Sequence, residues 1–580
     1  MARDVAMTER RTLVSKPRFI SAAAVRPMAT VALIALLCFL TVYPMLMLLY
    51  GAFASEPPGV AGSFNLAGFR HLLEARTWSI LWTTVALSLV KTVLSLVVAI
   101  GLAWIIARTD TPFRRTLEVL ITLPFFIPQI LTAMAWGLLG NPKAGSLNQL
   151  WRWLTGSPDA LINVYSYGGV VWHLMQYTVP FLFLLIVESF RSMDPSLEEA
   201  SRISGASRLR TFFGVTLMLS LPVLSSAFLL SFIKGMEAFE SPMIFGVPAG
   251  IQVVTTEIYQ SINQVARADY QYASALSFSV LAMLCILIVL QWKLLGNRSF
   301  QTVSGKAYRP ALVQLGHWKW ATFAICLLFF VATVLLPVGQ LALGSVFRFA
   351  GFYQLKMLTL DHWTAVLGDD AIWQSFANTM LLAVGGATAT AALGSVIAYI
   401  SIRTRWPGRR IIELLAWIPW LFPGIVLGVG FLWAYAFLPW PFDIYGTLWA
   451  LFFAYIALAT PLSVRIMSAA FQQLSYDLEE ASRTSGASWW TTFRQILLAL
   501  VWPSFSVGWV LTFFMVLREL SASVMLYSAN SEVLSVTMLK LWSNGKSEEV
   551  SAIALLMLGL VVVFRLLQLW LGNRELTGRR

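Results

Sequence analysis

The sequence predicts an all-α polytopic membrane protein, with about twelve transmembrane helices arranged as two parallel six-helix repeats. Composition is the first indication, since 58% of the 580 residues are hydrophobic and only 12% are charged. Soluble domains carry about 25% charged residues, so most of this chain must face something other than water. Apolar runs of roughly 20 residues and a long internal near-duplication complete the prediction.

Twelve apolar runs are long enough to cross a bilayer as helices. They cover residues 28–51, 80–107, 116–140, 166–190, 214–236, 272–294, 320–346, 374–402, 411–436, 446–470, 495–517 and 551–573. The basic stretches 108–115 and 403–410 then share one side with both termini, and Lys and Arg concentrate in cytoplasmic loops. The net charge of +13 is therefore explained by the basic residues of the cytoplasmic loops and reflects membrane topology. We expect the lipid bilayer as a partner and no nucleic acid.

The two halves of the chain repeat each other. The stretch LEEASRISGAS, from Leu197, returns from Leu478 as LEEASRTSGAS, with ten of eleven positions identical. Because six is an even number of spans, the second copy enters the membrane in the same orientation as the first. The expected organisation is a basic cytoplasmic tail (1–27), a first six-span domain (28–294), a cytoplasmic linker (295–319), a second six-span domain (320–573) and a cytoplasmic tail (574–580).

The duplicated peptide is predicted to form a short helix, a glycine turn and a second short helix, hereafter called an elbow. Helix-forming residues precede a glycine that readily supplies the turn. Loops normally diverge, so the retained peptide indicates docking of an equivalent partner on each half; an ordinary solvated loop is the alternative. The candidate coupling residues are Glu198, Glu199, Ala200, Gly205, Glu479, Glu480, Ala481 and Gly486.

A Glu-Ala pair followed five residues later by glycine, between the fourth and fifth spans of each half, resembles the EAA loop of type I binding-protein-dependent ABC importer permeases. The fused twelve-span form is most similar to ferric-iron transport permeases, a group with thiamine and 2-aminoethylphosphonate relatives. The motif departs from the family at Ser201 and Ser482, which replace its second alanine. Proline also stands later than in the family, at Pro222 and Pro503. The geometry of the kink at the start of the following span is therefore not predicted.

The resemblance implies a set of partners and a location. Two copies of a cytoplasmic ABC ATPase would hold the elbows, and a periplasmic binding protein would deliver the solute. The chain would be a multi-pass protein of the bacterial inner membrane with both termini in the cytoplasm. Ferric iron is the first expected solute, with 2-aminoethylphosphonate, thiamine or a polyamine as alternatives.

No catalytic, cofactor or metal site is expected in the chain itself. The Gly-Lys-Ser at 545–547 has Lys540 where a phosphate-binding loop needs its first glycine, so ATP hydrolysis is assigned to a separate subunit. The four histidines, at positions 71, 173, 317 and 362, lack metal-ligand spacing. The three cysteines, at positions 38, 285 and 326, lie in apolar runs and are interpreted as core residues.

Ionisable residues within or near the spans are candidate pathway residues. They are Lys91, Lys234, Glu237, Glu240, Arg518 and Glu519. One interpretation is the charged mouth of a translocation pathway for a polar or ionic solute. The other is interfacial snorkelling with local ion pairing, and both stay open at this point.

Two other classes of protein compete with the importer. A secondary transporter with two six-span repeats would place coupling groups near the bilayer midplane, where this chain offers few. A membrane enzyme would need a catalytic constellation beside the repeat, and the sequence contains no recognisable one.

Overall fold

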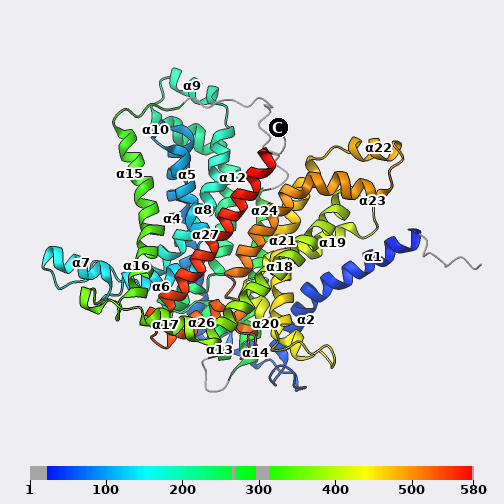
Figure 1. Ribbon diagram of the computed structural model, residues 1–580, viewed down its shortest axis with the longest axis horizontal. Helices are drawn as coiled ribbons and strands as arrows, with labels where there is room; N and C mark the ends of the chain where they lie inside the picture. Colours follow the sequence, from blue (N-terminus) through cyan, green and yellow to red (C-terminus); the bar gives the residue numbers. More distant parts are fainter. Residues whose placement is uncertain (1–21, 264–267, 296–311, 578–580) are drawn as a thin grey trace, which may run out of the picture.

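The computed structural model describes residues 22–263, 268–295 and 312–577. Most of the predicted basic tail, most of the predicted linker and the last three residues therefore lie outside the described residues. Within those ranges the chain is helical, and its extended segments pair only as three isolated bridges. Figure 1 shows two groups of helices that converge at the end carrying α13, α20 and α26 and diverge toward the end carrying α9 and α22.

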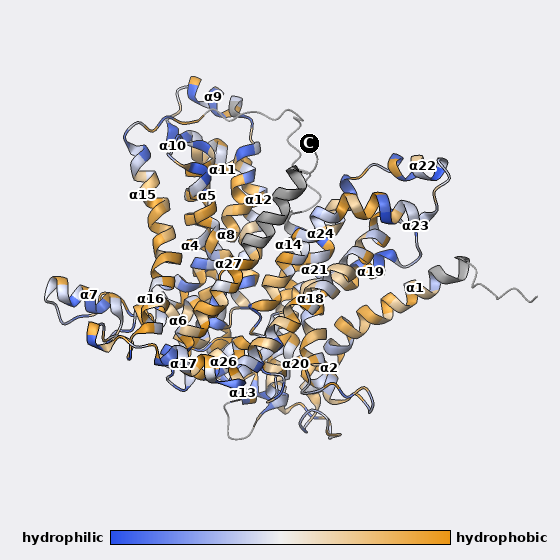
Figure 2. Cartoon of the chain, in the orientation of Figure 1, coloured by the Kyte–Doolittle hydropathy of each residue, from blue (hydrophilic) through white to orange (hydrophobic). Residues whose placement is uncertain are grey.

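Nine of the predicted spans correspond to long apolar helices in the described part of the chain, coloured mostly hydrophobic in Figure 2. The helices are Pro27–Phe53 (within α1 and α2), Ala75–Arg108 (α4), Tyr167–Ser192 (α8), Tyr270–Leu295 (α14), Trp318–Val346 (α15 and α16), Asp370–Arg403 (α18), Leu448–Gln473 (α21), Trp489–Leu517 (α23 and α24) and Ser547–Thr577 (α27).

The other three predicted spans, 116–140, 214–236 and 411–436, are bent pairs rather than straight helices. The pairs are Arg114–Phe126 (α5 and η2) with Gln129–Leu139 (α6) at 95°, Arg208–Leu219 (α10, η3 and α11) with Leu221–Met236 (α12) at 71°, and Arg409–Leu421 (α19 and η8) with Gly424–Ala436 (α20) at 113°. Proline stands at or beside each break: Pro124 and Pro128, Pro222, and Pro419 and Pro423. Proline cannot donate the helical hydrogen bond, and its ring clashes with the preceding turn.

Shorter helices complete the described chain. They are Ala67–His71 (α3), Ser146–Thr155 (α7), Pro195–Ile203 (α9), Val254–Asn263 (α13), Asp361–Gly368 (α17), Asp477–Thr484 (α22), Ser523–Leu526 (α25) and Leu534–Ser543 (α26). π-helical turns follow both elbows, at Phe212–Thr216 (η3) and Phe493–Leu497 (η9). Such turns are rare in helices, so their recurrence shows that the repeat extends to backbone detail.

Each half packs its first span against the other half. α1 and α2 lie on α19 and α20, and the Tyr43 hydroxyl donates a hydrogen bond to the Ala434 carbonyl, 3.0 Å away. In return, α15 and α16 lie on α5 and α6, and Thr111 shares a 2.7 Å hydrogen bond with Thr322. The largest buried cluster accordingly draws side chains from both halves, so the two halves share one hydrophobic core.

Candidate functional sites: two elbows and a charged cluster

The two elbows lie at the same end of the molecule, one on each diverging group of helices (Figure 1). In each, a helix ends at a glycine with a left-handed backbone, with φ of +87° at Gly205 and +82° at Gly486. The amide of the following alanine donates back to the carbonyl of Ser201 or Ser482, 3.1 Å away. This is a helix C-cap that glycine favours because it has no Cβ, and it forms the predicted turn in both copies.

A serine–threonine hydrogen bond joins the two short helices of each elbow. Ser201 and Thr211 lie 3.1 Å apart through their hydroxyl oxygens, and Ser482 and Thr492 lie 2.8 Å apart. In the sequence the two serines stand only as replacements for the motif's second alanine. The structure adds that each serine ties the helix before the turn to the helix after it.

Removing this bond is expected to loosen the elbow without unfolding the protein. A net contribution of about 1 kcal/mol per hydrogen bond predicts that Ser482→Ala speeds amide exchange in residues 477–484 roughly fivefold. Hydrogen exchange of the protein in lipid nanodiscs measures this. Ser506→Ala is the matched control, because Ser506 is half-buried and bonds only within its own helix, to the Trp502 carbonyl. Equal exchange in the two variants would contradict the role assigned to Ser482.

The four elbow glutamates divide into two outward-facing and two inward-facing residues. Glu199 and Glu480 are exposed, as are Ala200 and Ala481 beside them. Glu198 and Glu479 instead turn toward the ends of α4 and α18. All four were predicted as coupling residues, but only the outward pair is exposed at the surface.

The inward glutamates meet two buried arginines that the sequence analysis did not single out. Arg403 lies 2.8 Å from Glu479, and Arg108 lies 3.5 Å from Glu198. Both arginine side chains are 1% exposed, and a buried charge is costly unless it is paired. The signal was present in the repeat, because the two arginines occupy equivalent positions in ARTDTPFRR and IRTRWPGRR.

Three of the candidate pathway residues form one group in the first half. Lys234 pairs with Glu237 at 2.6 Å, and Glu237 also interacts electrostatically with Lys91. Lys91 is 1% exposed and donates to the Ser231 carbonyl at 2.8 Å. Lys91 therefore bridges α4 and α12 from a buried position.

Of the other three candidates, Arg518 contacts the break in the third span. Arg518 donates to the Phe125 carbonyl at 2.8 Å and to the Tyr177 hydroxyl at 2.5 Å. Its guanidinium also lies over both aromatic rings, 5.3 and 5.0 Å from their centroids. Arg518 belongs to the second half, so it links the halves by satisfying a carbonyl that the proline break leaves without a helical donor.

The two groups form one charged cluster. Glu240 interacts with Arg518, and Glu519 interacts with Glu240, Arg518 and Lys234. The structure thus brings together all six predicted residues. The cluster contains three cations and three acids, so it is balanced in formal charge, and Lys234 and Glu237 are its one ion pair among the described residues.

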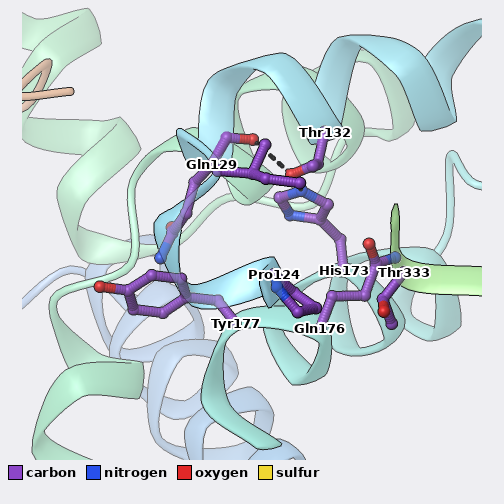
Figure 3. Close-up of a pocket in the computed structure, with 8 residues that line it drawn as sticks. Pro124, Gln129, Thr132, His173, Gln176, Tyr177 and Thr333 are labelled. Carbon is purple, nitrogen blue, oxygen red and sulfur yellow. Dashed lines mark hydrogen bonds between the residues drawn. The ribbon is translucent and has the colours of Figure 1, made fainter. Parts of the chain in front are cut away.

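A small polar cavity of about 10 Å³ lies beside this cluster (Figure 3). His173 lines it from within α8, and its Nε2 lies 2.9 Å from the Thr132 hydroxyl. Tyr177 lines the same cavity, and Thr333 reaches it from the second half. Roughly 10–15 Å³ accommodates one water molecule, so the cavity is far too small for a solute.

A larger cleft of about 400 Å³ opens near the start of α4, at the end of the molecule opposite the elbows. Its polar lining includes His71, Glu74, Asp269 and the ion pair between Arg76 and Glu257, which are 3.1 Å apart. Burial raises the pKa of Glu257, and Arg76 opposes that rise. Among the described residues, no three His, Cys, Asp or Glu side chains are placed to hold a metal ion.

Comparison with known proteins assigns the family. The sequence matches the family described as binding-protein-dependent transport system inner membrane component over residues 95–298 and again over 390–576. The chain belongs to this family. The two matches begin 295 residues apart, the same offset as between ARTDTPFRR and IRTRWPGRR, so the permease is a fusion of two family units.

Several relatives of this permease are transport proteins. It is 30% identical over 386 residues to the ferric transport system permease protein FbpB of Actinobacillus pleuropneumoniae, covering 66% of this chain and 55% of that protein. It is 25% identical over 519 residues to the probable ABC transporter permease protein y4fN of Sinorhizobium fredii, covering 87% and 88%. The spermidine/putrescine transport system permease protein PotC of Escherichia coli is 27% identical over 207 residues, covering 35% and 77%. The permease thus spans little more than half the length of FbpB.

Proposed function

We propose that this permease is the transmembrane subunit of an ATP-driven ABC importer and forms the translocation pathway for a small polar or ionic solute. The observation that carries the proposal is the duplicated elbow. Both copies keep the same capped turn, the same internal serine–threonine bond and the same outward glutamate. A surface retained in two diverged halves is expected where two equivalent partners dock.

Each elbow would dock one copy of a cytoplasmic ABC ATPase. Glu199 and Glu480 offer exposed carboxylates to basic groups of the ATPase, and apolar side chains stand out beside them. Ile203 is 87% exposed on the first elbow, and Trp490 is 58% exposed on the second. Exposed apolar surface next to charge is typical of protein interaction sites.

The elbow end would face the cytoplasm of a bacterial cell, and the opposite end would face the periplasm. Basic loops border the elbows, as expected for the cytoplasmic side, and both termini would lie there. A periplasmic binding protein would deliver its solute at the end that carries the 400 Å³ cleft. The division into domains at 28–294 and 320–573 stays a prediction based on the repeat.

The charged cluster would lie on the pathway between the halves. Transport would follow from alternating access, with ATPase closure favouring one arrangement of the halves through differential binding. The hydrogen bonds from Arg518 to Phe125 and Tyr177 join the halves in the present arrangement. They would change as the halves move.

Ferric iron is the proposed solute, supported by the 30% identity to FbpB. A polyamine is the second candidate, because PotC also matches. For 2-aminoethylphosphonate and thiamine, the support is the sequence resemblance alone.

Uptake into proteoliposomes tests the proposal. The permease, the ATPase encoded beside it and the cognate binding protein are reconstituted with ATP inside, and uptake of radiolabelled ferric iron is compared with that of radiolabelled spermidine. We expect ATP-dependent iron uptake that excess spermidine does not inhibit. Spermidine uptake without iron uptake would make spermidine the proposed solute in place of ferric iron. Uptake of either solute without ATPase or ATP would contradict the proposal of an ATP-driven importer.

A further inference from the structure

We infer that α4 and α18 are struts that connect each elbow to the charged cluster, and that Arg108 and Arg403 are positioning residues at their inner ends. The inference builds on the proposed function, because it describes how movement of a docked ATPase reaches the pathway. Three contacts, each present in both halves, carry it.

The first contact joins the elbow to the inner end of the strut. α4 ends at Arg108, which faces Glu198, and α18 ends at Arg403, which faces Glu479. These inward glutamates neighbour the outward Glu199 and Glu480 in the same short helices. Displacement of an elbow by a docked partner therefore acts directly on the end of α4 or α18.

The second contact joins the outer end of the strut to a short helix. The Thr84 hydroxyl of α4 accepts a hydrogen bond from the Val254 amide at 2.9 Å, at the first residue of α13. The Thr379 hydroxyl of α18 accepts one from the Leu534 amide at 2.8 Å, at the first residue of α26. Thr84 and Thr379 lie 295 residues apart, at the same offset as Arg108 and Arg403.

The third contact joins that short helix to the charged cluster. The Thr255 hydroxyl of α13 donates to the carbonyl of Ala238, the residue after Glu237. The Ser535 hydroxyl of α26 donates to the Glu519 carbonyl at 2.8 Å. The route in each half thus runs from elbow to strut and from strut to short helix. From the short helix it reaches the neighbour of a cluster residue, Ala238, in the first half and a cluster residue, Glu519, in the second.

The struts are suited to transmit displacement because they are unbroken. Each has 34 residues without proline, which at about 1.5 Å per residue gives a rod roughly 50 Å long. The third, fifth and ninth spans contain breaks of 71° to 113°, where a push would be absorbed by bending. The spans that lead into the elbows, α8 and α21, are shorter, with 26 residues each, and contain Pro180 and Pro461.

The strut of the second half makes more contacts with its elbow at the inner end than the strut of the first half does. Arg403 donates to the Leu474 and Ser475 carbonyls as well as to Glu479, and its guanidinium lies 4.1 Å from the centroid of the Tyr476 ring. Arg108 has no hydrogen-bond partner for its three guanidinium nitrogens among the described residues, and Glu198 accepts from Thr216 instead. Substitution of Arg403 should therefore have the larger effect.

Hydrogen exchange of the full-length permease in lipid nanodiscs tests the strut without any partner. Arg403→Ala is expected to speed exchange at least fivefold both in the elbow helix 477–484 and in the distant helix 534–543. Arg483→Ala is the matched control, because Arg483 is 60% exposed and 4.0 Å from the same Glu479, and such contacts contribute little. Faster exchange in 477–484 alone, or in neither segment, would overturn the strut.

A functional readout separates this inference from the proposed function. With ATPase and binding protein present, Arg403→Ala should still co-purify the ATPase, while stimulation of hydrolysis by the binding protein falls about tenfold. Arg403→Lys keeps the charge, but an ammonium cannot bond to the carboxylate and the carbonyls at the same time as a guanidinium does. This variant should retain an intermediate stimulation of hydrolysis. Thr379→Val, at the outer end, should lower stimulation without touching the elbow.

The outcomes of the two experiments can be told apart. Unchanged stimulation in both Arg403→Ala and Thr379→Val would overturn the strut while leaving the importer intact. A wild-type permease that binds no ATPase would overturn the proposed function, and the exchange experiment would still decide the strut.

Discussion

Replacing both elbow glycines, as Gly205→Val with Gly486→Val, is expected to abolish co-purification of the ATPase and all ATP-dependent transport. Both glycines have φ above +80°, and a β-branched residue in that region costs roughly 1–2 kcal/mol or more. A Cβ at either position would meet no atom of the described residues within 4 Å other than those of its chain neighbours. The strain therefore falls on the elbow backbone, and the added side chain projects into the open space where the proposed ATPase would dock.

The matched control for this variant is Gly156→Val with Gly545→Val. These glycines also have positive φ, at +69° and +77°, also have open space at the Cβ, and lie one in each half. They stand at the ends of α7 and α26, away from the elbows. We expect the control to keep the ATPase and transport. Loss in both variants, or in neither, would show that the elbow turn has no special role.

Replacing Arg518 with alanine is expected to reduce transport at least tenfold while the ATPase stays bound. The substitution leaves the Phe125 carbonyl and Tyr177 hydroxyl without their donor, at about 1–3 kcal/mol for each group that is buried. It also removes a cation that interacts electrostatically with Glu240 and Glu519. A change of 1.4 kcal/mol corresponds to a factor of ten, so the contact between the halves should be altered measurably.

This variant also distinguishes the two interpretations of the charged cluster. If the cluster lies on the pathway, solute uptake falls at least tenfold in protein that stays folded at the assay temperature, although the lost hydrogen bonds lower its thermal stability. If it only pairs charges locally, uptake stays within twofold while thermal stability falls. Tyr177→Phe, which removes one hydrogen bond and keeps the ring, should have a smaller effect, and Arg348→Ala, at an exposed arginine, should have none.

The sequence predicted the helices and their number well because the bilayer requires long apolar runs. It predicted the three bent spans less well, because hydropathy is a sum over residues and does not depend on the direction in which the helix axis runs. Pro124, Pro128, Pro419 and Pro423 were visible as repeated prolines. Their bends of 95° and 113° also depend on packing against neighbouring helices, which the local sequence does not contain.

The elbows were predicted from their near-identity, but the division of their glutamates was not. Glu198 and Glu199 have the same chemistry and differ only in the direction that a helical turn gives them. That direction was unknown until Arg108 was placed beside Glu198. The equivalence of Arg108 and Arg403 within the repeat was available, and a search for charges repeated at one offset could have found it.

Nothing in the sequence indicated that the first span of each half packs against the other half. Spans 28–51 and 320–346 read as ordinary members of their own repeats. Their partners are set by which apolar faces meet, as where Tyr43 bonds to Ala434. Hydropathy does not distinguish one apolar face from another.

The central claim is that the two elbows dock two ATPase subunits, and site-directed crosslinking tests it most directly. Glu199→Cys and Glu480→Cys are introduced, separately and together, after the three native cysteines are replaced, and the complex is treated with a short thiol-to-amine crosslinker. The account predicts one ATPase linked to each single variant, two linked to the double variant, and none linked to Leu73→Cys, an exposed position (76% exposed) near the outer cleft. Absence of ATPase adducts at both elbows, with equal or greater crosslinking at residue 73, would contradict it.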